Sequence, residues 1–189
     1  MSWFRVALIL HLIGVLALAG AIALELAGVL LLRTARTVEQ VRSAGGIMRR
    51  LPPLFGSSSG LILLSGIYMM VRLHSYGWTI VALVAVVLMS ALGSAIGKRH
   101  GQAVMAALKQ SKGSMTSNLQ KVISEDLILR NTINGACIVI GLTAIMVAKP
   151  TVVASVIVLV VAVLIGFAIS ARLNAPAAKN RSGHAGETI

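Results

Sequence analysis

Four side chains that can ligate a transition metal are spread over three apolar segments of the chain: His11, Met70, His74 and Met146. Imidazole and thioether groups suit copper, and one or two histidines can hold haem iron. The topology argued below places all four toward the outer face of a membrane. We therefore expect a cofactor site there, either haem b held by His11 and His74 or copper held by all four side chains.

The alternative to a cofactor site is that the same residues have structural roles. Methionine is a common filler of apolar cores, and His74 can be an interfacial residue at the end of its segment. His11 is the strongest candidate, because an ionisable side chain inside a membrane is costly and usually serves a function. The histidines His100 and His184 lie in polar segments and are expected to be solvated. The single cysteine, Cys137, is expected to fill apolar space.

A second candidate site is Glu25, a carboxylate inside the apolar run of residues 4–32. An unpaired charge is expensive in lipid, so Glu25 should face a neighbouring helix and a cation. Arg130, at the start of a later apolar segment, falls at a similar depth. We predict an intramembrane ion pair between Glu25 and Arg130. The alternative is that Glu25 titrates as the proton- or cation-binding group of a small transporter or channel.

The helix expected over residues 4–32 must position both candidate sites. Residues seven apart share one stripe of a helix, and a neighbouring stripe of small residues lets another helix approach closely. Gly20 falls on the opposite side. The ionisable stripe contains His11, Leu18 and Glu25, and the small stripe contains Gly14, Ala21 and Gly28. The segment extends well beyond the core of about 7 to 15 residues in a signal peptide, so we expect it to be retained.

Composition defines the class of protein. The chain has 189 residues, of which 57% are hydrophobic and 12% charged, and its mean hydropathy is +0.92. These values indicate one polytopic membrane domain. A single cysteine excludes an internal disulfide and any multi-cysteine metal site. The net charge of +12 is assigned to basic loops against anionic lipid headgroups, since no basic stripe with interleaved aromatics indicates nucleic acid binding.

We expect an all-α fold, a transmembrane bundle of five spans over residues 1–172, followed by a disordered cytoplasmic tail at 173–189. A spanning helix needs roughly 20 residues. The third span contains a Gly93–Gly97 pair, which we expect to be a helix-packing seam. The five apolar segments that meet the length requirement are residues 4–32, 53–73, 78–97, 128–148 and 151–171.

Helix-breaking residues separate these segments. The Gly45–Gly46 pair should interrupt the first loop, and Pro52–Pro53 suit the first turn of the next helix. Ser117 and Gln120 resemble a capping box that opens an amphipathic helix continuing into the fourth span. Lys149–Pro150 should separate the last two spans, because one helix through both would far exceed the hydrocarbon thickness of about 30 Å.

Basic residues predict the orientation. With five spans, Arg5, Arg72 and Lys149 fall on one side and the other 14 of the 17 lysines and arginines on the opposite side. The positive-inside rule then puts the N-terminus outside and the C-terminus in the cytoplasm. We expect a multi-pass protein of a bacterial plasma membrane.

Short motifs carry a resemblance to a known group of proteins. His11-Leu-Ile-Gly14 resembles the first-helix opening of bacterial membrane proteins related to the copper-resistance D proteins and to the haem b-containing membrane protoporphyrinogen oxidases. Leu64-Ser65-Gly66-Ile67-Tyr68 and Met146-Val-Ala-Lys149-Pro150 are similar to a predicted integral membrane family of unknown function within that group. The resemblance implies a helical membrane fold, and it implies a haem-linked role for His11.

Three functions follow as hypotheses. The first is a haem- or copper-handling membrane protein with His11 at its site. The second is a small proton-coupled transporter or channel that uses Glu25. The third is a non-catalytic assembly subunit, whose basic cytoplasmic face docks a membrane protein partner or a second copy. No Walker loop, HExxH or GxSxG motif supports a hydrolase or an NTPase, and the sequence assigns no enzymatic reaction.

Overall fold

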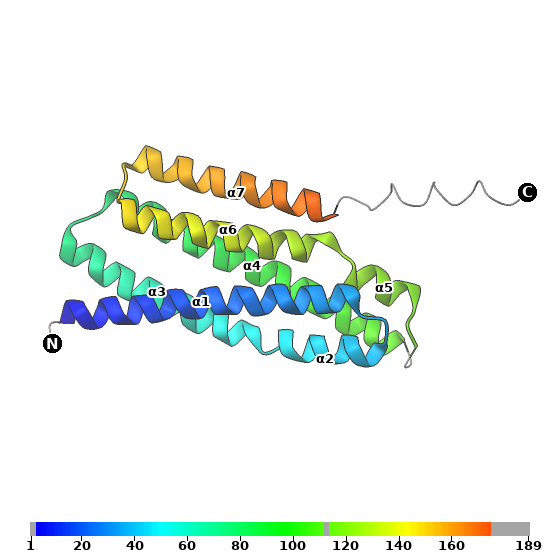
Figure 1. Cartoon of the computed structure of the whole chain (residues 1–189). Helices are drawn as coiled ribbons and strands as arrows, with labels where there is room; N and C mark the ends of the chain where they lie inside the picture. The colour runs from blue at the N-terminus through cyan, green and yellow to red at the C-terminus, as the bar shows by residue number, and fades with distance from the viewer. Residues whose placement is uncertain (1–2, 112–113, 175–189) are drawn as a thin grey trace, which may run out of the picture.

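The protein is an all-helical bundle, described for residues 3–111 and 114–174 by a computed structural model (Figure 1). These residues contain no strand. The long helices α1, α3, α4, α6 and α7 run alternately in opposite directions, and α2 precedes α3 in the same direction. The helices are α1 (Trp3–Thr34), α2 (Val38–Met48), α3 (Leu51–Leu73), α4 (Gly77–Gln110), α5 (Ser117–Ile123), α6 (Asp126–Ala148) and α7 (Val152–Asn174).

Five of these helices, α1, α3, α4, α6 and α7, include a segment long and apolar enough to cross a membrane. Their outward side chains are apolar and exposed, as at Leu16, Leu64 and Val147, which are 73%, 73% and 80% exposed. Such a surface suits lipid, because a soluble protein rarely exposes a large contiguous apolar patch. The structure therefore confirms an all-helical fold with five helices long and apolar enough to span a membrane. The architecture is compatible with a multi-pass integral membrane protein.

The start of α3 and the end of α6 lie at the prolines where the sequence predicts helix boundaries. Pro52 and Pro53 occupy the first turn of α3, where a missing backbone N–H costs nothing. His74 and Lys149 adopt left-handed backbone conformations, with φ of 50° and 47°, and follow the ends of α3 and α6. Pro150 then prevents α6 from continuing. The predicted breaks at Pro52–Pro53 and Lys149–Pro150 are confirmed.

The expected interruption at Gly45–Gly46 is wrong, because α2 runs through both glycines. A capping box between Thr37 and Gln40 starts this helix, and its buried residues Val38, Val41 and Ala44 anchor one face. Contacts along that face compensate for the low helix propensity of glycine.

Four further boundaries differ from the prediction. The N-cap of α5 is Thr116 and not Ser117, since the Thr116 hydroxyl accepts a hydrogen bond from the Leu119 N–H. The α5 helix does not continue into the fourth span, and Ser124–Glu125 separate it from α6. The third span does not stop at Gly97 but continues to Gln110, while α7 ends at Asn174. The rest of the predicted tail lies outside the described residues.

One end of the bundle carries an additional layer, formed by α2, the last turns of α4, and α5, which we call the basal layer (Figure 1). It has its own apolar core, to which the end of α1 contributes. Most of the basic side chains lie at this end, including Arg36, Arg42, Arg49, Arg50 and Lys121. The core residues are Leu32, Val38, Val41, Ala44, Val104, Ala107, Leu119 and Ile123.

Candidate functional site

His11 is buried between α1 and α3. Its side chain is 7% exposed, and its Nδ1 lies 3.1 Å from Oγ of Ser65. Ser65 Oγ also lies 2.5 Å from the carbonyl oxygen of Leu61, to which it donates its single proton. With that proton donated, the hydroxyl oxygen can accept from the His11 Nδ1–H, and the backbone of Ile62 is a second polar neighbour of the ring. This arrangement assigns the proton of a neutral His11 ring to Nδ1 and leaves Nε2 with a lone pair.

The other three predicted ligands lie in different surroundings. Met70 and Met146 are partly buried in α3 and α6. His74 is exposed after the end of α3 and makes an edge contact with Tyr76, with ring centroids 6.4 Å apart. Among the residues that the structure describes, no group of three or more His, Cys, Asp or Glu side chains is placed to hold a metal ion. That finding does not test a site built from histidine and methionine, which stays a prediction.

The predicted ion pair between Glu25 and Arg130 does not form between these two described residues. Glu25 faces the Thr132 hydroxyl of α6, whereas Arg130 is exposed. Two residues along a helix differ by about 200° around its axis, so Thr132 and Arg130 cannot both face α1. Counting residues along the expected spans put Glu25 and Arg130 at the same depth in the membrane. The rotation of α6 about its own axis decides which of its side chains faces α1.

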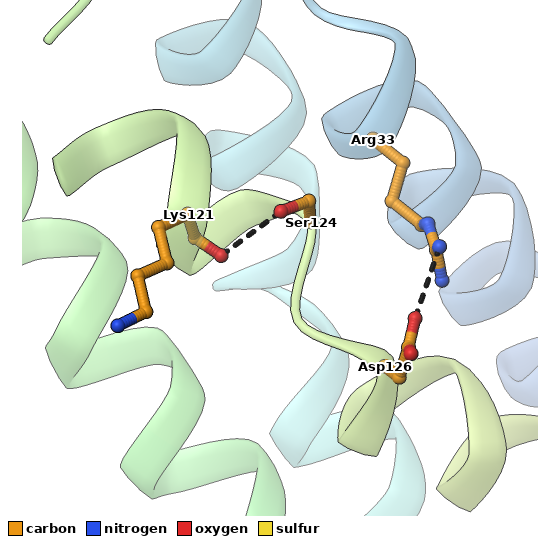
Figure 2. A network of polar contacts seen from close by, with 4 residues as sticks. All are labelled: Arg33, Lys121, Ser124 and Asp126. Carbon is orange, nitrogen blue, oxygen red and sulfur yellow. Dashed lines mark hydrogen bonds and ion pairs between the residues drawn. The ribbon is translucent and has the colours of Figure 1, made fainter. Parts of the chain in front are cut away.

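The ion pair that joins these helices lies nearer the basal layer, between Arg33 and Asp126 (Figure 2). Arg33 Nη2 is 3.1 Å from Asp126 Oδ1, and the two side chains are 23% and 45% exposed. Ser124 Oγ donates to the Lys121 carbonyl and closes the end of α5. The chain then turns into α6, and Asp126 in its first turn meets the last turn of α1.

A cavity of about 1030 Å³ lies among the helices and reaches the basal layer. Glu25 from α1 and Thr132 from α6 form part of its wall. Further polar groups come from three helices, namely Ser59, Ser90, Ser94, Asn131 and Asn134. The remaining wall is largely apolar. Pockets with a few polar groups in an apolar wall are the usual form of small-molecule sites, at roughly 300 to 1,000 Å³.

Glycines create much of this space. The Gly93–Gly97 pair, expected to be a packing seam, faces the cavity. A methyl group added at Gly93 would lie 3.9 Å from Asn131 Nδ2, and one at Gly97 would meet no described atom within 4 Å. Five lining glycines leave such open space: Gly45, Gly56, Gly97, Gly101 and Gly135. The small residues on α4 therefore keep a volume open and do not bring two backbones together.

The prediction that His100 is solvated is wrong. Its side chain is 7% exposed and lines the cavity, and its Nδ1 lies 3.4 Å from Oε2 of Glu125. The burial follows from spacing, because His100 stands in a 4-3-4-3 register with Gly93, Gly97, Val104 and Ala107. That register was the signal available in the sequence. It was missed because the polar residues around His100 suggested a loop.

Two buried polar atoms of the described residues have no hydrogen-bond partner, His100 Nε2 and Asn134 Oδ1. Both residues line the cavity. Asn134 Oδ1 packs against Gly166 of α7, where an added methyl group would collide with it. Buried polar atoms are nearly always paired, so His100 Nε2 is the unpaired atom that still lacks an explanation. Cys137 packs as a partly buried side chain beside Ile133, in line with the filler role, and His184 lies outside the described residues.

Comparison with known proteins yields no match: no protein-family model, curated protein or solved structure is similar to this chain. The resemblance to the copper-resistance D and protoporphyrinogen oxidase group therefore stays a prediction. The candidate sites depend on the geometry given above.

Proposed function

We propose that this protein is a small membrane transporter whose solute binds in the cavity and whose proton- or cation-binding group is Glu25. The observation that carries the proposal is the position of Glu25 in the wall of a cavity of about 1030 Å³ inside the apolar bundle. Carboxylates in membrane helices commonly mark ion pathways and proton relays, since their burial is costly without a function.

The surroundings of Glu25 support reversible ion binding. It has the Thr132 hydroxyl as a neighbour and no ion pair with any described cation. A carboxyl group locked to arginine would have to break that pair before it could exchange a proton. A carboxyl group beside a hydroxyl and an internal cavity can exchange a proton without such a loss.

Flux through reconstituted protein tests this proposal. Liposomes with purified protein and an enclosed pH-sensitive dye are given a proton gradient, and dye response is compared with that of empty liposomes. We expect wild-type protein to carry protons and Glu25→Gln, which preserves size and hydrogen bonding, to reduce the flux to the empty-liposome rate. Glu39→Gln, a change of the same type at an exposed position of α2, should leave the flux unchanged. Equal flux for wild type and Glu25→Gln overturns the proposal.

We infer a second candidate function, the handling of haem or copper, from the hydrogen bond between His11 and Ser65. Histidines that bind metals commonly donate their other ring N–H to a neighbouring acceptor, which fixes the tautomer. His11 has that arrangement, with Nδ1–H donated and Nε2 available. An imidazole with thioethers from Met70 and Met146 fits copper as a donor set. Bound copper would supply a redox-active or transferable ion, and His74 would assist at the end of α3.

Spectroscopy and metal analysis of the purified protein test this second function. Copper content and the visible spectrum are measured before and after incubation with Cu(I) or haem. We expect one equivalent of either cofactor in the wild type and a loss of binding in His11→Ala. A protein with neither a Soret band nor copper after reconstitution contradicts the proposal, and so does full retention in His11→Ala.

A further inference from the structure

The cavity has one charged end and one apolar end. Near the basal layer its wall includes the cationic side chains Arg49 and Lys98 together with His100. At the other end it is lined by apolar side chains near the midpoints of their helices, which are Leu18 of α1, Met89 of α4, Ile138 of α6 and Val163 of α7. A ligand that fills both ends must itself be amphiphilic.

Arg49 and Lys98 specify the charge of the polar group, and His100 lines the cavity at the same end. A carboxylate only accepts hydrogen bonds, so His100 donates its Nδ1–H to Glu125, at 3.4 Å. The ring is 93% buried, and its Nε2 has no partner among the described residues. In a neutral ring that donates Nδ1–H, this Nε2 keeps a lone pair, as in His11, and takes a donor such as a water molecule. Arg49 and Lys98 supply two positive charges at the same end of the cavity.

Few acidic side chains line the cavity that could pair with its basic residues in place of a bound anion. Among the described lining residues Glu25 is the one acidic side chain, and it faces Thr132 in the membrane-spanning part of α1. Glu125 and Asp126, which follow α5, are not lining residues, and Asp126 is paired with Arg33. The charged end is therefore built for an anion and the deeper part for a hydrocarbon chain.

We propose that the ligand of this cavity is a single-chain anionic amphiphile, a fatty carboxylate or a lysophosphate. Its headgroup binds at Arg49 and Lys98, beside His100, and its chain extends between Leu18 and Ile138. One chain suits the size of the cavity, which is at the upper end of the range for pockets that hold one small molecule. The proposal rests on the transporter function and names its substrate class.

Equilibrium binding tests the substrate class without any flux measurement. Purified protein in phosphatidylcholine nanodiscs is titrated with radiolabelled palmitate, palmitoyl lysophosphatidate and palmitoyl lysophosphatidylcholine. The two anionic probes should bind roughly tenfold more tightly than the zwitterionic one, because the zwitterion keeps its phosphate charge but adds a choline cation that Arg49 and Lys98 repel. Inorganic phosphate should not displace them. Equal binding of the zwitterion overturns the proposal, and displacement by inorganic phosphate identifies a free-anion site instead.

Neighbouring residues of α4 provide matched variants. Both side chains are exposed, but Lys98 lines the cavity and the adjacent Arg99 does not. Lys98→Ala should weaken palmitate binding roughly tenfold, while Arg99→Ala, which removes the same charge, should leave it unchanged. His100→Gln should weaken binding in the same way, and Lys98→Ala keeps the test decisive if His100→Gln does not fold. Equal effects of Lys98→Ala and Arg99→Ala contradict the headgroup site.

The two proposals fail in different ways. If palmitate and lysophosphatidate do not bind while Glu25-dependent proton flux is present, the substrate class is wrong and the transporter proposal stands. If they bind with the expected variant pattern but Glu25→Gln leaves the flux unchanged, the binding site is supported and the transporter proposal is wrong.

Discussion

Gly14 of α1 lies directly against Ile62 of α3. A methyl group at Gly14 would stand 2.9 Å from Ile62 Cγ1 and 3.2 Å from the Ile62 backbone nitrogen. A flexible side chain can move aside, but the backbone of α3 cannot. This contact sets how closely the two helices approach, and α1 makes its most extensive contacts with α3.

We predict that Gly14→Ala lowers the free energy of unfolding by about 1 to 3 kcal/mol, as expected for overpacking a close helix contact. Unfolding of the purified protein by SDS in mixed micelles measures the change. Gly20→Ala is the control, since a methyl group there meets no described atom within 4 Å. That variant should match or slightly exceed the wild type in stability, because alanine favours the helix. Equal destabilisation by both substitutions contradicts the close contact.

The hydrogen bond between His11 and Ser65 predicts a second effect on stability. Ser65→Ala removes the acceptor of the Nδ1–H and should cost about 0.5 to 1.5 kcal/mol, the usual net value of one hydrogen bond. Ser57→Ala is the comparison, because the exposed Ser57 hydroxyl bonds only to the Leu54 carbonyl of its own helix in the described contacts. SDS unfolding should separate the two variants. No difference between them speaks against the assigned proton position.

The Arg33–Asp126 ion pair should contribute more than an exposed pair. Asp126→Asn removes a charge that is 3.1 Å from Arg33 and at the start of α6, where the helix dipole also favours an anion. We expect a loss of about 1 kcal/mol. Glu39→Gln breaks the exposed pair with Arg42, at 3.6 Å, and should cost less than about 0.5 kcal/mol. The difference should shrink at high salt, which screens both pairs.

Filling the cavity should separate binding from stability. Gly97→Leu places a large side chain where no described atom lies within 4 Å of the first added carbon. We expect proton flux and palmitate binding to be lost, while SDS unfolding stays close to that of the wild type. Wild-type flux in Gly97→Leu would show that the solute does not use this cavity. A strongly destabilised protein would show that the space around Gly97 is smaller than described.

Charge distribution predicts which face of the membrane each connection occupies. In a Cys137→Ser background, a cysteine introduced by Ser75→Cys in the α3–α4 connection should react with a membrane-impermeant maleimide in intact cells. A cysteine from Ser43→Cys in α2 should react only after the cells are opened, because the basic basal layer should lie in the cytoplasm. The reverse labelling pattern contradicts the orientation.

Much of the fold is encoded locally. The five helices that are long and apolar enough to span a membrane follow from runs of apolar residues. The helix boundaries at Pro52–Pro53 and Lys149–Pro150 follow from the missing backbone N–H and the restricted φ of proline. The small face of α1 was also predicted correctly, since Gly14 and Gly28 are buried and Gly20 is exposed. Helices at the basal layer were harder to predict, because contacts with Leu119 and Val104 stabilise a helix through Gly45–Gly46 despite its weak propensity.

The sequence by itself therefore determined how many long apolar helices there are, where prolines start α3 and stop α6, and which face of α1 approaches a neighbour. Hydropathy and turn chemistry act between residues close in the chain, so they can be read in order. Only the tertiary structure decided that Glu25 meets Thr132 and not Arg130, and that Gly93 and Gly97 face a cavity. Those outcomes depend on the rotation of each helix about its axis, which is fixed by the packing of all the helices together.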